Sequence, residues 1–124
     1  MKFLARHEPN AYLLLRLVFG FLFSCHGIQK IFGVLGGPKV APGFDLEFIG
    51  GVIELVGGAL IFLGLFTRPA AIIVSGEMAV AYFKFHGPHG FFPIVNMGEL
   101  AVIYCFVALF IACKGAGRLG IDRS

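Results

Sequence analysis

The amino-acid sequence predicts an all-α membrane protein: a bundle of four transmembrane helices with both termini in the cytoplasm. Three observations favour this fold. Hydrophobic residues make up 58% of the 124 residues and charged residues only 14%, whereas an average soluble domain carries about 25% charged residues. Four segments approach the roughly 20 mostly apolar residues that a membrane-spanning helix needs. The positive charges are unequally divided between the two ends of these segments.

The four predicted helices cover residues 11–31, 46–66, 69–85 and 97–113, in one domain of residues 1–124. Glycines and prolines between positions 36 and 43 end the first helix, and Thr67, Arg68 and Pro69 form the link after the second. Pro69 suits the first turn of a helix, where its missing N–H is not needed. The stretch HGPHGFFP, residues 86–93, separates the third helix from the fourth. Glycines between positions 115 and 120 end the last one.

The positive charges predict the orientation. Four spans place both termini on one side of the membrane, and seven basic residues belong to that side against three on the other. Positive residues are enriched in cytoplasmic segments, so both termini are expected in the cytoplasm. The first set is Lys2, Arg6, Arg16, Arg68, Lys114, Arg118 and Arg123, and the second is Lys30, Lys39 and Lys84. The alternative, a cleaved signal peptide in the first span, is disfavoured because Arg16 interrupts its apolar region.

Ionisable residues inside the predicted spans are the most informative feature, because such groups are costly in hydrocarbon. In the first helix Arg16, Phe23 and Lys30 recur every seven residues, with His26 close to the same face. In the second helix Glu54 shares a face with glycines at positions 50, 57 and 64. Small residues let helices approach closely, so this face is expected to point into the bundle.

The third and fourth helices add further polar groups. Glu77, Ala81 and Lys84 share one face of the third helix, and Glu99 begins the fourth. The fourth helix also carries a stripe of small residues at positions 101, 105, 108 and 112. At about 1.5 Å per residue, three side chains lie roughly 10 to 14 Å below the outer surface. These are His26, Glu54 and Glu77.

The resulting hypothesis is a polar pocket that opens to the non-cytoplasmic side, with Lys30, Lys84 and Glu99 nearer the surface. The alternative is that the same groups only hold the helices together. Polar contacts between membrane helices contribute about 0.6 kcal/mol each, whereas an unpaired charge at the membrane centre costs at least about 2.5 to 3.5 kcal/mol. We therefore favour a functional role for Glu54 and Glu77. For Arg16 we favour a structural one, because its side chain can reach the inner face.

Other chemistries find little support. The net charge of +3 is weak for a nucleic-acid-binding protein, and no phosphate-binding loop or nucleophile–base arrangement stands out. Cys25, Cys105 and Cys113 show no C-x-x-C spacing and are interpreted as small packing residues. His86 and His89 have no further ligand nearby in the sequence, so no metal site is predicted. No catalytic residue is assigned.

Four stretches together make the sequence resemble the DoxX family of small bacterial four-helix membrane proteins. They are RLVFGFLFSCHGIQKIFG, GGVIELVGGALIFLGLFTRPAA, HGPHGFFPIVNMGELAVIY and the GAG near the C-terminus, between about residues 16 and 117. Met97 stands where the family usually has glycine before GEL. The polar positions that match are Arg16, His26, Lys30, Glu54, Arg68, Glu77, Asn96 and Glu99. Asn96 is therefore added to the candidate pocket residues. Arg68 is grouped with Arg16 and Lys84 as a structural residue.

The resemblance implies a protein of the bacterial inner membrane and a connection to quinone chemistry, since the family takes its name from a subunit of a thiosulfate:quinone oxidoreductase. It suggests an accessory subunit of a membrane redox system that binds quinone. Because no haem, flavin or cluster motif is visible in the sequence, the electrons would come from a redox partner protein. Two alternatives are a non-enzymatic scaffold that anchors a partner, and a transporter of protons or small solutes. A transporter would require a homo-oligomer, because four helices enclose little space.

Overall fold

The computed structural model describes residues 1–36 and 46–122, and within these ranges the chain is helical with no strand. The all-α prediction is therefore confirmed for this part of the chain. Its elements are α1 (Lys2–Ala5), α2 (Glu8–Phe32), α3 (Leu46–Leu63), α4 (Thr67–Ala81), the π-helix η1 (Tyr82–His86), the 3₁₀ helix η2 (Gly87–His89), α5 (Pro93–Asn96) and α6 (Glu99–Lys114). The predicted break at Gly37, Pro38, Pro42 and Gly43, with Lys39 and Arg123 of the charge argument, lies outside the described residues.

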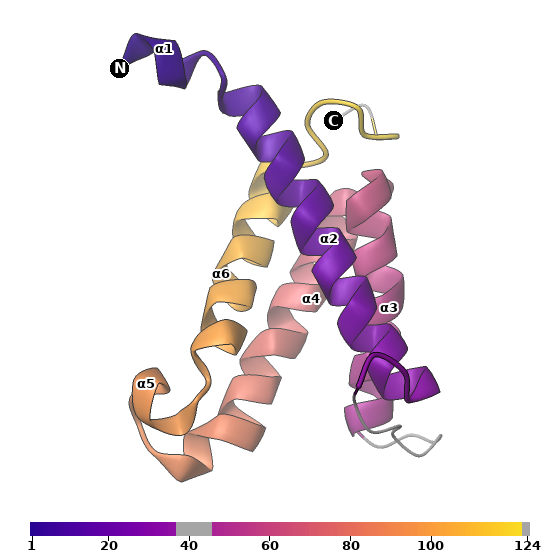
Figure 1. Ribbon diagram of the computed structural model, residues 1–124, viewed down its shortest axis with the longest axis vertical. Helices are drawn as coiled ribbons and strands as arrows, with labels where there is room; N and C mark the ends of the chain where they lie inside the picture. Colours follow the sequence, from indigo (N-terminus) through magenta and orange to yellow (C-terminus); the bar gives the residue numbers. More distant parts are fainter. Residues whose placement is uncertain (37–45, 123–124) are drawn as a thin grey trace.

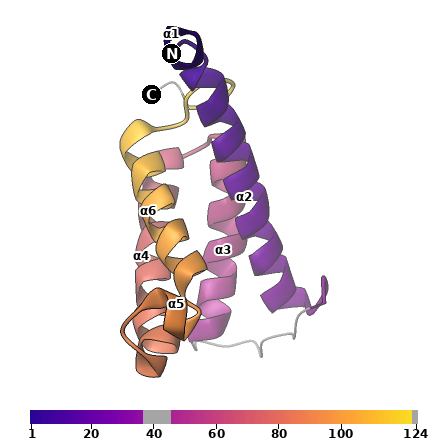
Figure 2. The same cartoon turned by 60° about the vertical axis from the view of Figure 1, so that its left-hand side comes forward.

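The long helices α2, α3, α4 and α6 lie side by side (Figures 1 and 2). The N-terminus and the segment after α6 lie at one end, and η1, η2 and α5 lie at the other. Toward this second end α2 and α6 diverge (Figure 1). By length and composition, α2 is the one helix in the described ranges that is long and apolar enough to cross a membrane.

Glycines bring α2 and α3 into near contact of their backbones. A Cβ added at Gly27 would lie 2.6 Å from the Cα of Leu55, and one at Gly58 would lie 2.6 Å from the backbone nitrogen of Ser24. No side chain fits at such distances, so these positions set the separation of the two helices. Two glycines of the predicted stripe, Gly50 and Gly57, face α4, since a Cβ at Gly57 would lie 2.7 Å from Val74. Gly64 lies just after α3, and a Cβ there would lie 3.1 Å from Arg16 of α2.

The α4–α6 pair is held by small side chains. Ala71 of α4 and Ala108 of α6 are fully buried. The hydroxyl of Ser75 donates a hydrogen bond of 2.8 Å to the carbonyl of Cys105, satisfying a polar group where water cannot reach. The predicted stripe of small residues on the last helix thus faces α4.

The link between the second and third predicted helices lies earlier than expected. Thr67 and Arg68 belong to α4, and the turn before α4 lies at residues 64–66, where Gly64 and Phe66 have positive φ. The carboxylate of Asp122 accepts hydrogen bonds from the backbone N–H groups of Phe66 (2.9 Å) and Thr67 (2.8 Å). A side chain distant in sequence therefore caps α4, a role usually held by the residue just before the helix.

The segment after α6 packs against the N-terminal half of α2. Arg16 is only 1% exposed, and its guanidinium donates hydrogen bonds to the carbonyls of Ala116, Arg118 (3.1 Å) and Phe62 (3.4 Å). Tyr12 adds a 2.6 Å hydrogen bond to the carbonyl of Gly115. Arg16 is thus enclosed by protein, where the sequence predicted a side chain that extends to the membrane surface.

Candidate functional site

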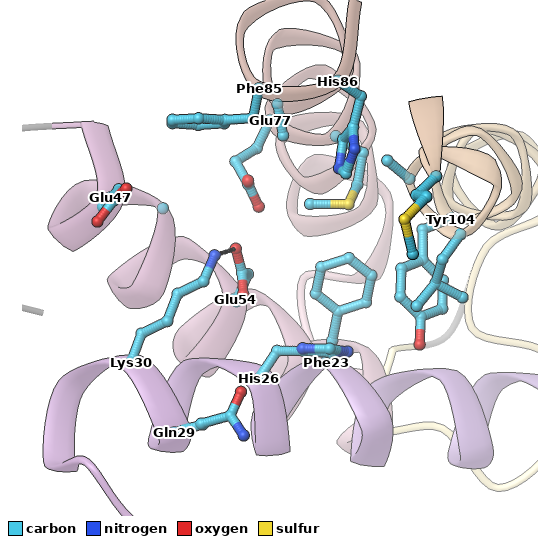
Figure 3. Close-up of a pocket in the computed structure, with 16 residues that line it drawn as sticks. Phe23, His26, Gln29, Lys30, Glu47, Glu54, Glu77, Phe85, His86 and Tyr104 are labelled. Carbon is cyan, nitrogen blue, oxygen red and sulfur yellow. Dashed lines mark hydrogen bonds and ion pairs between the residues drawn. The ribbon is translucent and has the colours of Figure 1, made fainter. Parts of the chain in front are cut away.

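A cavity of about 470 Å³ lies in the half of the molecule opposite the termini (Figure 3). Its walls come from the C-terminal turns of α2, the first half of α3, the end of α4 with η1, and the start of α6. The lining residues are Phe23, His26, Gln29, Lys30, Glu47, Gly50, Glu54, Glu77, Met78, Ala81, Phe85, His86, Met97, Leu100, Ala101 and Tyr104. Four candidates from the sequence, His26, Lys30, Glu54 and Glu77, therefore share one cavity.

Glu54 is buried at the inner wall of this cavity. Its Oε2 lies 2.7 Å from the Nζ of Lys30, so α2 and α3 are joined here by an ion pair (Figure 3). An ionised carboxylate in an apolar interior requires a partner of opposite charge. The lysine supplies that partner and also brings its own charge to the cavity wall.

Glu77 projects from α4 toward Glu54 (Figure 3). Both carboxyl groups reach the same spot above Gly50, since a Cβ added there would lie 3.5 Å from Oε2 of Glu77 and 3.6 Å from Oε2 of Glu54. The Oε1 of Glu77 is buried and has no hydrogen-bond partner. The two carboxyl groups therefore lie close together, and of the two only Glu54 has a cation at ion-pair distance among the described residues.

His86 enters the cavity because the chain forms a π-helix at Tyr82–His86. The wider π-turn interrupts the 3.6-residue periodicity that placed Lys84 on the Glu77 face, so Lys84 is exposed and His86 faces the cavity. The Nδ1 of His86 lies 3.1 Å from the carbonyl oxygen of Asn96. A carbonyl only accepts hydrogen bonds, so Nδ1 carries a hydrogen, and in the neutral ring Nε2 remains an acceptor.

Aromatic rings form the wall toward the termini. The ring of Tyr104 on α6 lies 4.7 Å from that of Phe23 and 5.9 Å from that of His26, measured between centroids. The cavity therefore has an apolar and aromatic wall beside its charged one. This combination is typical of sites for small organic ligands with a few polar atoms.

Two of the predicted pocket residues, Asn96 and Glu99, lie outside the cavity. Asn96 organises the loop before α6: its amide donates to the hydroxyl of Tyr82 and the carbonyl of Gly90, each at 3.0 Å, and its Oδ1 accepts from the backbone of Gly98 at 2.8 Å. Glu99 is exposed in the first turn of α6. Arg68, at the other end, donates hydrogen bonds to the last carbonyls of α6, at residues 112, 113 and 114.

Sequence reasoning missed four lining residues with polar side chains: Gln29, Glu47, His86 and Tyr104. Tyr104 could have been found, because it lies three residues after Ala101 and four before Ala108 and so shares their face of the helix. His86 could not, because its position depends on the π-helix. Among the described residues, no group of three or more His, Cys, Asp or Glu side chains could hold a metal ion, and the three cysteines are free.

The sequence of this chain is similar to a family of known proteins and to several individual proteins. The DoxX family model matches residues 11–87. An uncharacterized protein of Haemophilus influenzae is 41% identical over 99% of this chain and 96% of its own length. The inner membrane protein YqjF of Escherichia coli is 30% identical over 94% of this chain and 92% of its own. A Bacillus subtilis protein named "Putative oxidoreductase CatD" is 28% identical over 89% and 83%. No solved structure is significantly similar.

Proposed function

We propose that this chain, which belongs to the DoxX family of membrane proteins, is a quinone-binding accessory subunit of a membrane redox system. The main support is one observation: three carboxyl groups and a lysine line a cavity that also has an apolar and aromatic wall, in a membrane protein. Ionisable groups in such surroundings are costly, and their presence favours a functional site.

The chemistry of the walls suits a quinone ring. The flat apolar ring would lie against Phe23 and Tyr104, and its two carbonyl oxygens need hydrogen-bond donors. Lys30 and the imidazole of His26 are donors at the cavity surface. Conversion of a quinone to its hydroquinone takes up two electrons and two protons. Glu54 and Glu77 are placed to hold such protons, and a partner redox protein would exchange the electrons.

The relatives support the same class of function and a location. The B. subtilis relative bears the name "Putative oxidoreductase CatD" and the E. coli relative the name "Inner membrane protein YqjF". We place this chain in the bacterial inner membrane as a multi-pass protein. The excess of positive residues at the end that holds the termini favours a cytoplasmic location for that end. The cavity would then open toward the non-cytoplasmic side.

Mass spectrometry of organic extracts from the mildly purified protein tests the proposal. We expect quinone in a stoichiometric amount from the natural protein and from Glu99→Ala, which removes an exposed carboxylate outside the cavity. We expect little from Glu54→Ala or from Glu54→Gln, which preserves the side-chain volume. Extracts of the natural protein that contain only bulk phospholipid would contradict the proposal and favour a scaffold, to be sought among co-purifying proteins.

A further inference from the structure

The ring of long helices in the described chain is closed unevenly. Close backbone packing joins α2 to α3, α3 to α4 and α4 to α6, and no comparable packing joins α6 back to α2. We call this last boundary the α2–α6 seam. At the level of the cavity its sides are Phe23, His26 and Gln29 on α2, and Met97, Leu100 and Tyr104 at and near the start of α6.

Rings close the seam only in its inner part. Tyr104 contacts the ring of Phe19 at 5.5 Å, and it also contacts Phe23 and His26. One turn further toward α5 the lining residues are Leu100, which is 51% exposed, and Met97, which is 84% exposed. The helices also diverge in this direction (Figure 1). The cavity therefore has an opening on the side of the molecule, between two helices, and the α6 side of this opening is apolar.

We propose that the α2–α6 seam admits a lipid-soluble ligand from the bilayer, with the polar head in the cavity and an apolar tail between α2 and α6. This rests on the proposed function and names its substrate class, a quinone that bears a prenyl tail. Lipid is as apolar as a protein interior, so moving the tail into an enclosed pocket would gain little. An open seam lets the tail stay among lipid chains while the ring reaches Glu54 and Lys30.

A second route is less favoured by the structure. An apolar cavity of about 670 Å³ lies between α4, α6 and the η1–α5 region. It shares the wall residues Met78 and Ala101 with the first cavity. Both side chains are buried and form the wall that the two cavities have in common.

The test compares two probes on the protein in lipid nanodiscs: a prenyl-tailed benzoquinone and the same ring with a methyl group in place of the tail. Because Leu100 also lines the cavity, the readout is the ratio of the two affinities: we expect Leu100→Trp to weaken binding of the tailed probe about tenfold more than binding of the tailless probe, equivalent to about 1.4 kcal/mol. Met97→Trp, at a more exposed position, is also expected to weaken binding of the tailed probe more than binding of the tailless one. It provides an independent measurement if Leu100→Trp does not fold.

The control variants lie on the same helix. Ile103→Trp changes an exposed residue that lines none of these cavities, and should affect neither probe. Val102→Trp fills the second cavity and is also expected to be silent. If both probes bind and only Val102→Trp discriminates against the tail, or if no variant does, the seam is not the route. If neither probe binds the natural protein, the proposed function itself fails, and this inference with it.

Discussion

The Nζ of Lys30 and the Oε2 of Glu54 lie 2.7 Å apart, but the two side chains differ sharply in exposure, at 34% and 2%. Lys30 can therefore regain water if its partner is lost, whereas Glu54 cannot. We expect Lys30→Met to lower the free energy of unfolding by about 2 kcal/mol, because it leaves the buried carboxylate of Glu54 without its partner. This is below the roughly 3–5 kcal/mol for breaking a fully buried pair, because water on the lysine side of the pair already weakens its attraction. Glu54→Gln should lower the free energy of unfolding by less, because the lysine that it leaves unpaired can regain water.

The double variant Lys30→Met/Glu54→Gln distinguishes this explanation from a simple loss of packing. Its loss of stability should be smaller than the sum of the two single losses, because no unpaired carboxylate remains. Thermal unfolding of the three variants in one detergent measures these differences. Strict additivity would show that the ion pair contributes nothing to stability.

The α2–α3 contact makes a prediction about two glycines. A Cβ at Gly27 would lie 2.6 Å from the Cα of Leu55, whereas one at Gly76 would have nothing within 4 Å. Gly27→Ala is expected to force the helices apart at a cost of about 1–3 kcal/mol. Gly76→Ala should be neutral or slightly stabilising, because alanine loses less backbone freedom in a helix. The melting temperatures of the purified variants check both, and equal values would contradict the packing argument.

The hydrogen bonding of His86 predicts a difference between binding of the hydroquinone and binding of the quinone. Its Nδ1 is engaged by the carbonyl of Asn96, so Nε2 of the neutral ring can accept a hydrogen bond from a ligand hydroxyl. His86→Asn places an amide near the Nδ1 position and removes the acceptor, whereas His86→Gln keeps an acceptor near Nε2. We expect the asparagine variant to bind a hydroquinone about tenfold more weakly, with little change for the quinone. Titration of both ligand forms tests this, and identical behaviour of the two variants would refute it.

The cap of α4 predicts a dependence of stability on pH. Hydrogen bonds from the backbone N–H groups of Thr67 and Phe66 hold the pKa of Asp122 below the ordinary value of 3.8. A group with a lowered folded-state pKa stabilises the fold above its unfolded pKa, and this contribution is lost as pH falls through the lowered value. Asp122→Ala should cost about 1 kcal/mol near neutral pH. The difference from the natural protein should shrink only below about pH 4 in thermal unfolding experiments.

The resemblance of the sequence to the DoxX family is confirmed by the family model, and much of the helical pattern followed from local signals. Long apolar segments located the long helices, because hydrophobic length is a property of neighbouring residues. The start of α4 could not be located in this way. It is capped by Asp122, a residue 55 positions away from Thr67, and such a partner leaves no trace near the helix.

The candidate site, too, could be predicted from the sequence only in part. His26, Lys30, Glu54 and Glu77 lie together because each occupies the inward face that helical periodicity assigns to it. Lys84 was expected nearer the surface, and its side chain is exposed. Regular periodicity did not indicate His86, which lines the cavity from the end of the π-helix. Such a change of turn depends on the packing of the loop that Asn96 organises, and the spacing of residues cannot reveal it.

The enclosure of Arg16 has a consequence for biosynthesis. Its guanidinium lies in the first long helix to be made, but the carbonyls of Ala116 and Arg118 that receive it follow all the long helices in the chain. During translation this charge must therefore remain hydrated or bind a temporary partner until the later segment emerges. Insertion of the first helix and maturation of this end of the molecule are thus separate events in time, and only the second yields the finished protein.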